Sequence, residues 1–375
     1  MCSASSTIDN RSDNSQTFRS IVKLALRATV GLLLLSGCSR EETTPPVGAV
    51  SSSGDKVVII SSLKPFALLI DEVYGDVVES SYLVPPEQSP HHVTLKPSAV
   101  NRLRGADLAL WAGPELESFL PNLLDRFEFK ALGAEPASIP PDGARFQLAA
   151  LTVLPSHLLV EYQDGKEIAE DKEQPEQDGH SHALGSIDPH FWLSLDAVEA
   201  LLIALEPVIV RLHTGNAQAD TAREAPTREK LSSARERFID KLRSSFPLRG
   251  SEIVDKFPLI YSYHPAFNYL LADLGIPDEG YLTKNPESGV PPSAIAAFLE
   301  AASQNEVCML AEPQYRQPVE RLMARLADDA HARTRTVVAD PLGVEAASFS
   351  ELYGNVRKAL RACLGAEPLT TQPAA

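Results

Sequence analysis

Short runs of apolar residues alternate with amphipathic stretches along most of the chain. The apolar runs predict buried strands at residues 56–60, 107–112, 258–263, 307–311 and 337–339, and an alternating stretch predicts another at 77–84. Helical spacing is found between them, at 65–73, 97–104 and 115–127 and then in stretches that end at Leu274 and Leu326. Buried strands that alternate with helices are typical of parallel sheets covered on both faces. We therefore expect an α/β fold with two lobes, each a mostly parallel sheet flanked by helices.

An amphipathic stretch with a different character lies between the two halves. Thr227–Ser245 carries apolar residues at helical spacing, with charged residues on its other faces: Leu231, Ala234, Phe238 and Leu242. This pattern predicts a long helix that packs along one side and joins the lobes. Pro226 is compatible with the first turn of this helix and would break any helix that ran through it. We therefore expect an N-terminal lobe at 55–215, a linking helix at 216–249 and a C-terminal lobe at 250–365.

The two ends of the chain have the character of export and tether segments. Basic residues precede the uncharged apolar stretch 28–37, which is too short to span a membrane, so residues 1–37 are expected to be a signal peptide. The stretch runs into Cys38 through Leu-Ser-Gly, which resembles a lipobox and makes Cys38 a candidate for lipidation. Ordinary cleavage beside an incidental cysteine is the alternative. Residues 38–54 are expected to be a polar tether and residues 366–375 a flexible tail.

Charge and cysteine content narrow the possible functions. The 375 residues include 34 Lys and Arg against 50 Asp and Glu, a net charge of −16 that disfavours a nucleic-acid-binding protein. Eight of the 50 acidic residues lie in 161–182, where we expect a mobile surface loop whose His180 and His182 could hold an auxiliary metal ion. In an exported chain, Cys308 and Cys363 are left in an oxidising compartment. A disulfide between them is the default, and two buried free thiols are the alternative.

Several histidines lie where a ligand site is expected. His264 directly follows the predicted strand 258–263, and Asp340 directly follows 337–339. His91 lies just past the stretch 77–84, and His190 lies in the segment Asp-Pro-His-Phe-Trp-Leu-Ser. Open α/β sheets bind ligands outside the carboxyl ends of their strands, and imidazole with carboxylate is a common donor set for Zn²⁺. A single histidine of this kind is more often a loop or core residue, so a metal site and structural histidines both stay open at this point.

Six short segments, in this order, resemble the zinc-specific solute-binding proteins of ABC importers over residues 56–363. They are Ser89-Pro90-His91 with Leu95-Lys96-Pro97-Ser98, Ala106-Asp107-Leu108 with Leu116-Glu117, Asp188-Pro189-His190-Phe191-Trp192-Leu193-Ser194, Tyr263-His264, Ala311-Glu312-Pro313-Gln314 and Asp340-Pro341-Leu342-Gly343. The resemblance implies two α/β lobes joined by a long rigid helix, with the metal held in the cleft between them. It also implies that a membrane permease of the ABC type receives the metal. We expect such a protein to be a monomer in the periplasm or at the extracytoplasmic membrane surface, with a possible lipid anchor as its contact with the membrane.

The resemblance also implies a set of site residues. Carried over by motif, the zinc ligands are His91, His190 and His264, and Asp340 is the expected fourth ligand. In some zinc relatives water takes that place, and the alternative role of Asp340 is a helix N-cap. Asp188 could orient His190 or cap the turn that follows, and Glu312 could be structural or lie next to the metal. Cys308 and Cys363 match a disulfide of zinc-type members.

Other functions on the same fold give competing expectations. A manganese-binding solute-binding protein or an adhesin would share these motifs, but manganese relatives have Glu where this chain has His264, and imidazole suits Zn²⁺. A zinc hydrolase would need an open coordination position and a general base. The sequence has no His-Glu-x-x-His, Gly-x-Ser-x-Gly or Walker-type motif. We therefore expect a zinc-binding transport protein and not an enzyme.

Overall fold

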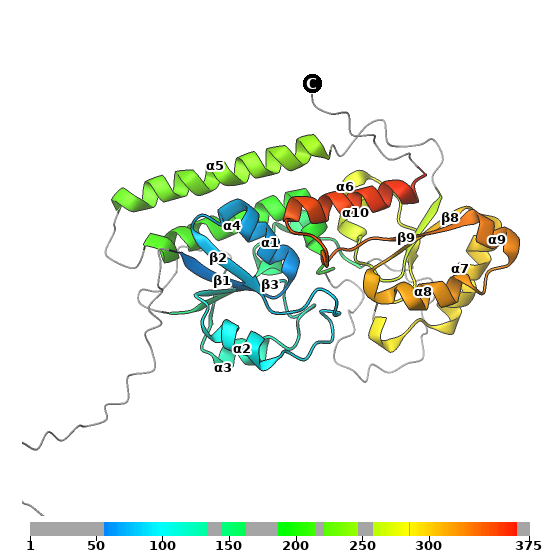
Figure 1. Cartoon of the computed structure of the whole chain (residues 1–375), viewed down its shortest axis with the longest axis horizontal. Coiled ribbons are helices and arrows are strands. Elements are labelled where there is room, and N and C mark those ends of the chain that lie inside the picture. The colour runs from blue at the N-terminus through cyan, green and yellow to red at the C-terminus, as the bar shows by residue number, and fades with distance from the viewer. Residues whose placement is uncertain are drawn as a thin grey trace, which may run out of the picture. The chain divides into compact units, whose positions relative to one another are not determined.

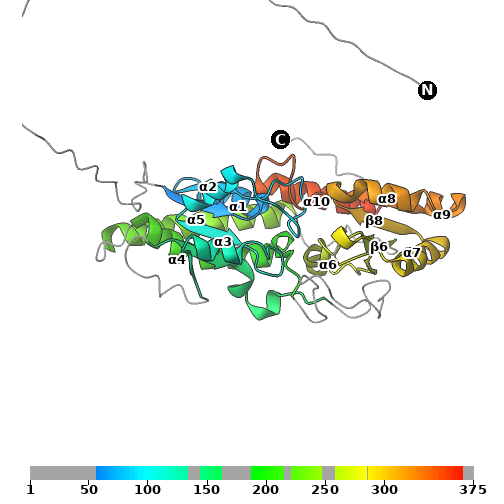
Figure 2. The same cartoon turned by 90° about the horizontal axis from the view of Figure 1, so that it is seen from below.

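The computed structural model describes residues 56–133, 144–162, 187–214, 221–246, 258–284 and 286–365 (Figures 1 and 2). The expected leader, Cys38, the tether, the tail, and His180 and His182 in the acidic loop lie outside these residues. Val50–Ala375 form one compact unit. Within the described ranges, no helix is both long enough and apolar enough to cross a membrane.

The first sheet is built from five parallel strands in the order β2-β1-β3-β5-β4. Its strands are β1 (Val57–Ser61), β2 (Val78–Tyr82), β3 (Leu108–Trp111), β4 (Lys130–Ala131) and β5 (Phe146–Ala149). The helices of this half are α1 (Lys64–Tyr74), α2 (Pro97–Arg104), α3 (Pro121–Arg126) and α4 (Leu195–Thr214), with short 3-10 helices at Ala150–Thr152, Ser156–Leu158 and Phe191–Leu193. All four residues of β3 are buried, as its apolar run predicts for a central parallel strand.

The second sheet has four parallel strands in the order β7-β6-β8-β9. They are β6 (Leu259–Ser262), β7 (Gly280–Tyr281), β8 (Val307–Ala311) and β9 (Thr334–Val338). The helices are α6 (Asn268–Leu274), α7 (Pro292–Gln304), α8 (Arg316–Met323), α9 (Asp328–Arg333) and α10 (Phe349–Cys363), with 3-10 helices at Pro286–Ser288 and Pro313–Tyr315. The prediction of two α/β lobes with parallel sheets is therefore confirmed.

The long helix α5 (Thr221–Ser245) runs along α4 and α1 (Figure 1). Its Phe238 ring also lies 6.1 Å from the ring of Phe349 at the start of α10, so one helix contacts elements of both halves. The expectation that Pro226 breaks the helix is wrong, because α5 continues through it. Pro226 is exposed in the second turn of α5, where it removes one backbone hydrogen bond, and the helix continues on both sides of it.

The predicted helix 115–127 is also shorter than expected, since α3 begins only at Pro121. Pro121 has no N–H to donate to the carbonyl of Glu117, so a regular helix does not cross that point. Residues 116 and 117 instead donate their backbone N–H groups to the carbonyl of Gly113 in turns. The Glu117 side chain folds back toward the end of β3.

The two halves are held together by contacts between α1 and the chain around α10. Glu72 of α1 accepts hydrogen bonds from the backbone N–H of Ser350 (2.8 Å) and from its hydroxyl (2.5 Å). Lys64, at the start of α1, donates to the carbonyl of Val344 (2.9 Å).

A disulfide joins Cys308 of β8 to Cys363 at the end of α10, with their Cα atoms 5.6 Å apart. One apolar cluster includes buried residues of both sheets, and a second cluster lies within the second lobe, so the two lobes share part of their core.

A buried carboxyl group braces the carboxyl ends of β1 and β3. Glu117 accepts hydrogen bonds from the Ser62 hydroxyl and from the amides of Ala112 (3.2 Å) and Gly113 (3.1 Å). Burial raises the pKa of Glu117 to about 7, and these hydrogen bonds only partly oppose that rise.

This raised pKa predicts a specific dependence of stability on pH. The folded state holds the Glu117 proton above the ordinary pKa of 4.5, so the free energy of unfolding should fall as the pH rises from about 4.5 to about 7. Glu117→Gln removes the titration, and the wild-type protein should lose up to ~3 kcal/mol relative to this variant over that range. Urea unfolding at several pH values measures the difference, and parallel pH profiles for the two proteins would contradict the assignment.

Candidate metal site

His91 is carried by the loop that follows β2. The loop starts as a continuation of the sheet, since the N–H groups of Leu83 and Val84 donate to the carbonyls of Ser61 and Ser62 (2.9 Å each). Three prolines then bring the chain to His91, which is half-buried: Pro85, Pro86 and Pro90. His92, the next residue, is exposed. The motif therefore selects the histidine that points into the molecule.

His190 is buried and fixed by Asp188. One oxygen of this carboxylate accepts the backbone N–H of His190 (2.9 Å) and also its ring Nδ1–H (2.7 Å). A carboxylate can only accept, so Nδ1 carries the ring proton and Nε2 is left with a lone pair. The Trp192 indole, two residues on, donates to the carbonyl of Pro341 in the other half of the chain (2.8 Å). Asp188 therefore orients His190, and it does not cap the 3-10 helix that follows, whose N-cap is His190 with no side-chain cap.

His264 has the same arrangement in the second lobe. It follows β6, and its Nδ1 donates to the carboxylate of Glu312, which comes directly after β8 (2.8 Å). His264 and Glu312 are both buried, 3% exposed each. Parallel strands bring their carboxyl ends to one edge, and β6 pairs with β8, so this pair of residues follows from the topology.

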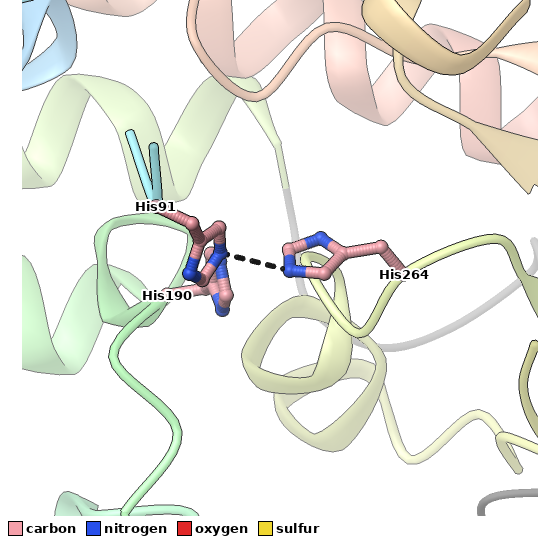
Figure 3. Close-up of side chains that lie close together, drawn as sticks. All are labelled: His91, His190 and His264. Carbon is pink, nitrogen blue, oxygen red and sulfur yellow. Dashed lines mark hydrogen bonds between the residues drawn. The ribbon is translucent and has the colours of Figure 1, made fainter. Parts of the chain in front are cut away.

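The three histidines converge (Figure 3). One nitrogen from each of His91, His190 and His264 lies within 4.8 Å of the others, and the Nε2 atoms of His91 and His264 are 3.0 Å apart. Tetrahedral zinc with Zn–N bonds of roughly 2.0–2.1 Å needs its nitrogens roughly 3.3 Å apart. A cavity of about 20 Å³ lies beside them, lined among others by Trp192 and Tyr315, and it has room for one ion or one water molecule.

Asp340 does not join this group in the structure. Its Oδ1 accepts the N–H groups of Leu342 (3.0 Å) and Gly343 (2.9 Å), and its Oδ2 accepts that of Val344 (2.5 Å). Among the described residues, the group that could hold a metal ion consists of the three histidines and does not include Asp340. The carboxylate caps the turn after β9. It is not the helix N-cap that the sequence left as the alternative, because the next helix, α10, begins only at Phe349 and has Ser348 as its N-cap.

Burial and hydrogen bonding leave nitrogen lone pairs of the histidines available to bind a cation. Burial lowers the pKa of His190, while Asp188 opposes this shift by attraction and by its hydrogen bond. The imidazole is therefore neutral at pH 7, with its Nε2 lone pair available. Carboxylates behind His190 and His264 fix the orientation of each ring, as acceptors do behind most metal-binding histidines. The arrangement can hold a divalent cation of the zinc type through nitrogen donors from both lobes.

The other histidines in the described part of the chain lie away from this group. His157, His213 and His331 are not among the clustered nitrogens.

Two hydrogen bonds near the site were not predicted from the sequence: from Trp192 to the carbonyl of Pro341, and from Gln314 to the carbonyl of Pro86 (2.7 Å). The one sequence feature that pointed to Trp192 and Gln314 was their place in segments that resemble the family.

Comparison with known proteins gives a consistent picture. Residues 59–363 match the family model of ZnuA, described as zinc-uptake complex component A, periplasmic. The chain is similar to the high-affinity zinc uptake system protein ZnuA of Yersinia pestis, at 27% identity over 296 residues that cover 76% of this chain and 83% of that protein. Similarity to ZnuA of Brucella abortus is 26% over 333 residues, or 84% and 93% of the two chains. A crystal structure of ZnuA superposes with a TM-score of 0.58 at 19% identity, and covers 82% of this chain and 99% of that one.

Proposed function

The chain belongs to the periplasmic zinc-uptake complex component A family, and on that basis we propose that His91, His190 and His264 hold the zinc ion that it captures. The protein is the zinc-binding component of an uptake system and acts outside the cytoplasm. Members of this family are binding proteins for transport and not enzymes. The captured Zn²⁺ is then passed to the membrane permease of an ABC importer.

The observation that carries the site assignment is the meeting of three imidazole nitrogens from both lobes, within 4.8 Å of one another, beside a small cavity. With Nδ1 of His264 donating to Glu312, the short contact between His91 and His264 is a hydrogen bond from the Nε2–H of His91 to the Nε2 of His264. A divalent cation takes the place of that shared proton. Binding of zinc then links the loop of one lobe to the strand end of the other.

Metal content tests the choice of ion. Protein purified without chelator should contain about one zinc per chain, and Zn²⁺ should displace Mn²⁺ in direct competition because three nitrogen donors favour the softer ion. Elemental analysis and competition titration measure both quantities. Retention of Mn²⁺ against equal Zn²⁺ would instead assign the chain to the manganese-binding function on the same fold.

Substitution of Asp340 distinguishes a site with three histidine ligands from a site that also has a carboxylate ligand. Asp340→Asn keeps one acceptor oxygen and loses the bond to the Val344 amide, so it should destabilise the fold by about 1 kcal/mol and weaken zinc binding less than tenfold. Chelator competition with the purified variant measures the affinity. A loss of 100-fold or more would place the Asp340 carboxylate on the metal.

Features at the ends of the chain extend this proposal. A leader at 1–37 would export the protein, and a lipid on Cys38 would keep it at the extracytoplasmic membrane surface, as the pattern of basic, apolar and small residues suggests. All three histidines come from one chain, which supports a monomer as the functional unit.

His180 and His182 would serve as an auxiliary capture site in the acidic loop.

A further inference from the structure

We propose that Gln314 is a positioning residue, which holds the loop carrying His91 across the two lobes and thereby slows the release of zinc. The proposal rests on the assignment of His91 as a zinc ligand. Gln314 lies in the 3-10 helix Pro313–Tyr315 of the second lobe, and its Nε2 donates to the carbonyl of Pro86 in the first lobe (2.7 Å). Gln314 also lines the cavity beside the three histidines.

The segment between Pro86 and His91 is built to transmit this anchor. Pro85, Pro86 and Pro90 each have a backbone φ locked by the ring, and the N–H of Gln88 donates to the carbonyl of Pro85 in a tight turn (3.0 Å). Pro86 and Pro90 are also buried. A chain with so few free dihedrals moves as a unit, so a hydrogen bond at Pro86 fixes the position of His91.

The three proposed ligands differ in how they are held. His190 and His264 are buried, and each has a carboxylate on its Nδ1, at 2.7 and 2.8 Å. His91 is half-buried and lies on a loop, where the bond from Gln314 joins its segment to the second lobe. Release of zinc toward solvent should therefore begin with His91, because it is the most exposed of the three ligands and lies on a loop.

One short segment of the second lobe thus acts on two ligands. Glu312 orients His264, and Gln314, two residues later, holds the segment of His91. The ring of Tyr315 stacks on Tyr263 with centroids 5.0 Å apart, which fixes the segment against the end of β6. Residues 312–315 therefore couple the ligand of one lobe to the ligand of the other.

The test compares zinc dissociation from matched variants of the full mature chain. Gln314→Met keeps the shape of the side chain and removes the donor, and loss of one hydrogen bond should speed dissociation about threefold to tenfold. Gln147→Met is the control, because Gln147 donates to the carbonyl of Phe129 within the first lobe (3.4 Å). Its dissociation rate should equal that of the wild type. Rates are measured by stopped flow after mixing zinc-loaded protein with excess chelator.

A double-mutant cycle with His91→Ala shows whether Gln314 acts through His91. In the His91→Ala background, Gln314→Met should change dissociation less than about twofold. An unchanged rate for Gln314→Met alone would overturn the proposal, and so would an equal acceleration with and without His91. Wild-type affinity in His91→Ala itself is a separate result, which would remove His91 from the zinc site.

Discussion

Replacing His264 with alanine should abolish tight zinc binding, with a loss in affinity of roughly 100-fold or more. The variant removes the nitrogen that the second lobe contributes to the cluster and leaves the buried carboxylate of Glu312 without its partner. Structural zinc sites bind with roughly 10–16 kcal/mol shared among three or four ligands, so one ligand is worth several kcal/mol. Isothermal titration or chelator competition measures the change.

The control for this variant is His331→Ala. His331 is an exposed histidine of α9 in the same lobe and lies outside the cluster, so its loss should leave zinc affinity unchanged. Circular dichroism of both variants checks that the fold persists. A dissociation constant near the wild-type value for His264→Ala would refute the proposed site.

Removing the disulfide should produce the largest change in stability. Cys308 and Cys363 are 55 residues apart, and both are fully buried, so Cys308→Ala with Cys363→Ala should lower the free energy of unfolding by roughly 3–4.5 kcal/mol on the loop-entropy model. Zinc affinity should change little, because neither cysteine is in the cluster.

Denaturant unfolding of oxidised protein and of the double variant measures this difference. Titration of thiols in the unreduced, unfolded protein provides an independent check, since neither cysteine should react. Two reactive thiols, or a double variant within about 1 kcal/mol of the wild type, would show that the bridge does not stabilise the exported protein.

The parallel sheets were predictable because their central strands are continuous apolar runs. β3 and β8 are buried at every residue, and the runs in the sequence give both positions. β9 was found only in part, and the structure starts it at Thr334. Arg335 and Thr336 are exposed on this edge strand, so its first residues carry no apolar signal. Pro226 led to a wrong prediction of a helix break, because the second turn of α5 accommodates the loss of one backbone hydrogen bond.

The site could be predicted where strand ends carry the ligands, and less well elsewhere. His264 follows β6, so topology alone places it at the edge where ligands bind. His190 follows no named strand, and only its motif identified it. Asp340 also lies near a strand end, but its carboxylate turns back to the amides of its own loop. The position of a residue in the sequence thus predicts which edge of the sheet it lies at, but it does not predict where a short side chain such as that of Asp340 points.

The most direct test of the zinc site is anomalous diffraction at the zinc edge from crystals of the zinc-loaded protein. A single strong peak should lie between His91, His190 and His264, with each Nε2 at about 2.0–2.1 Å from the metal and the Asp340 oxygens beyond ~3 Å. A peak held by His180 and His182 alone, or one that His264 does not reach, would contradict the account.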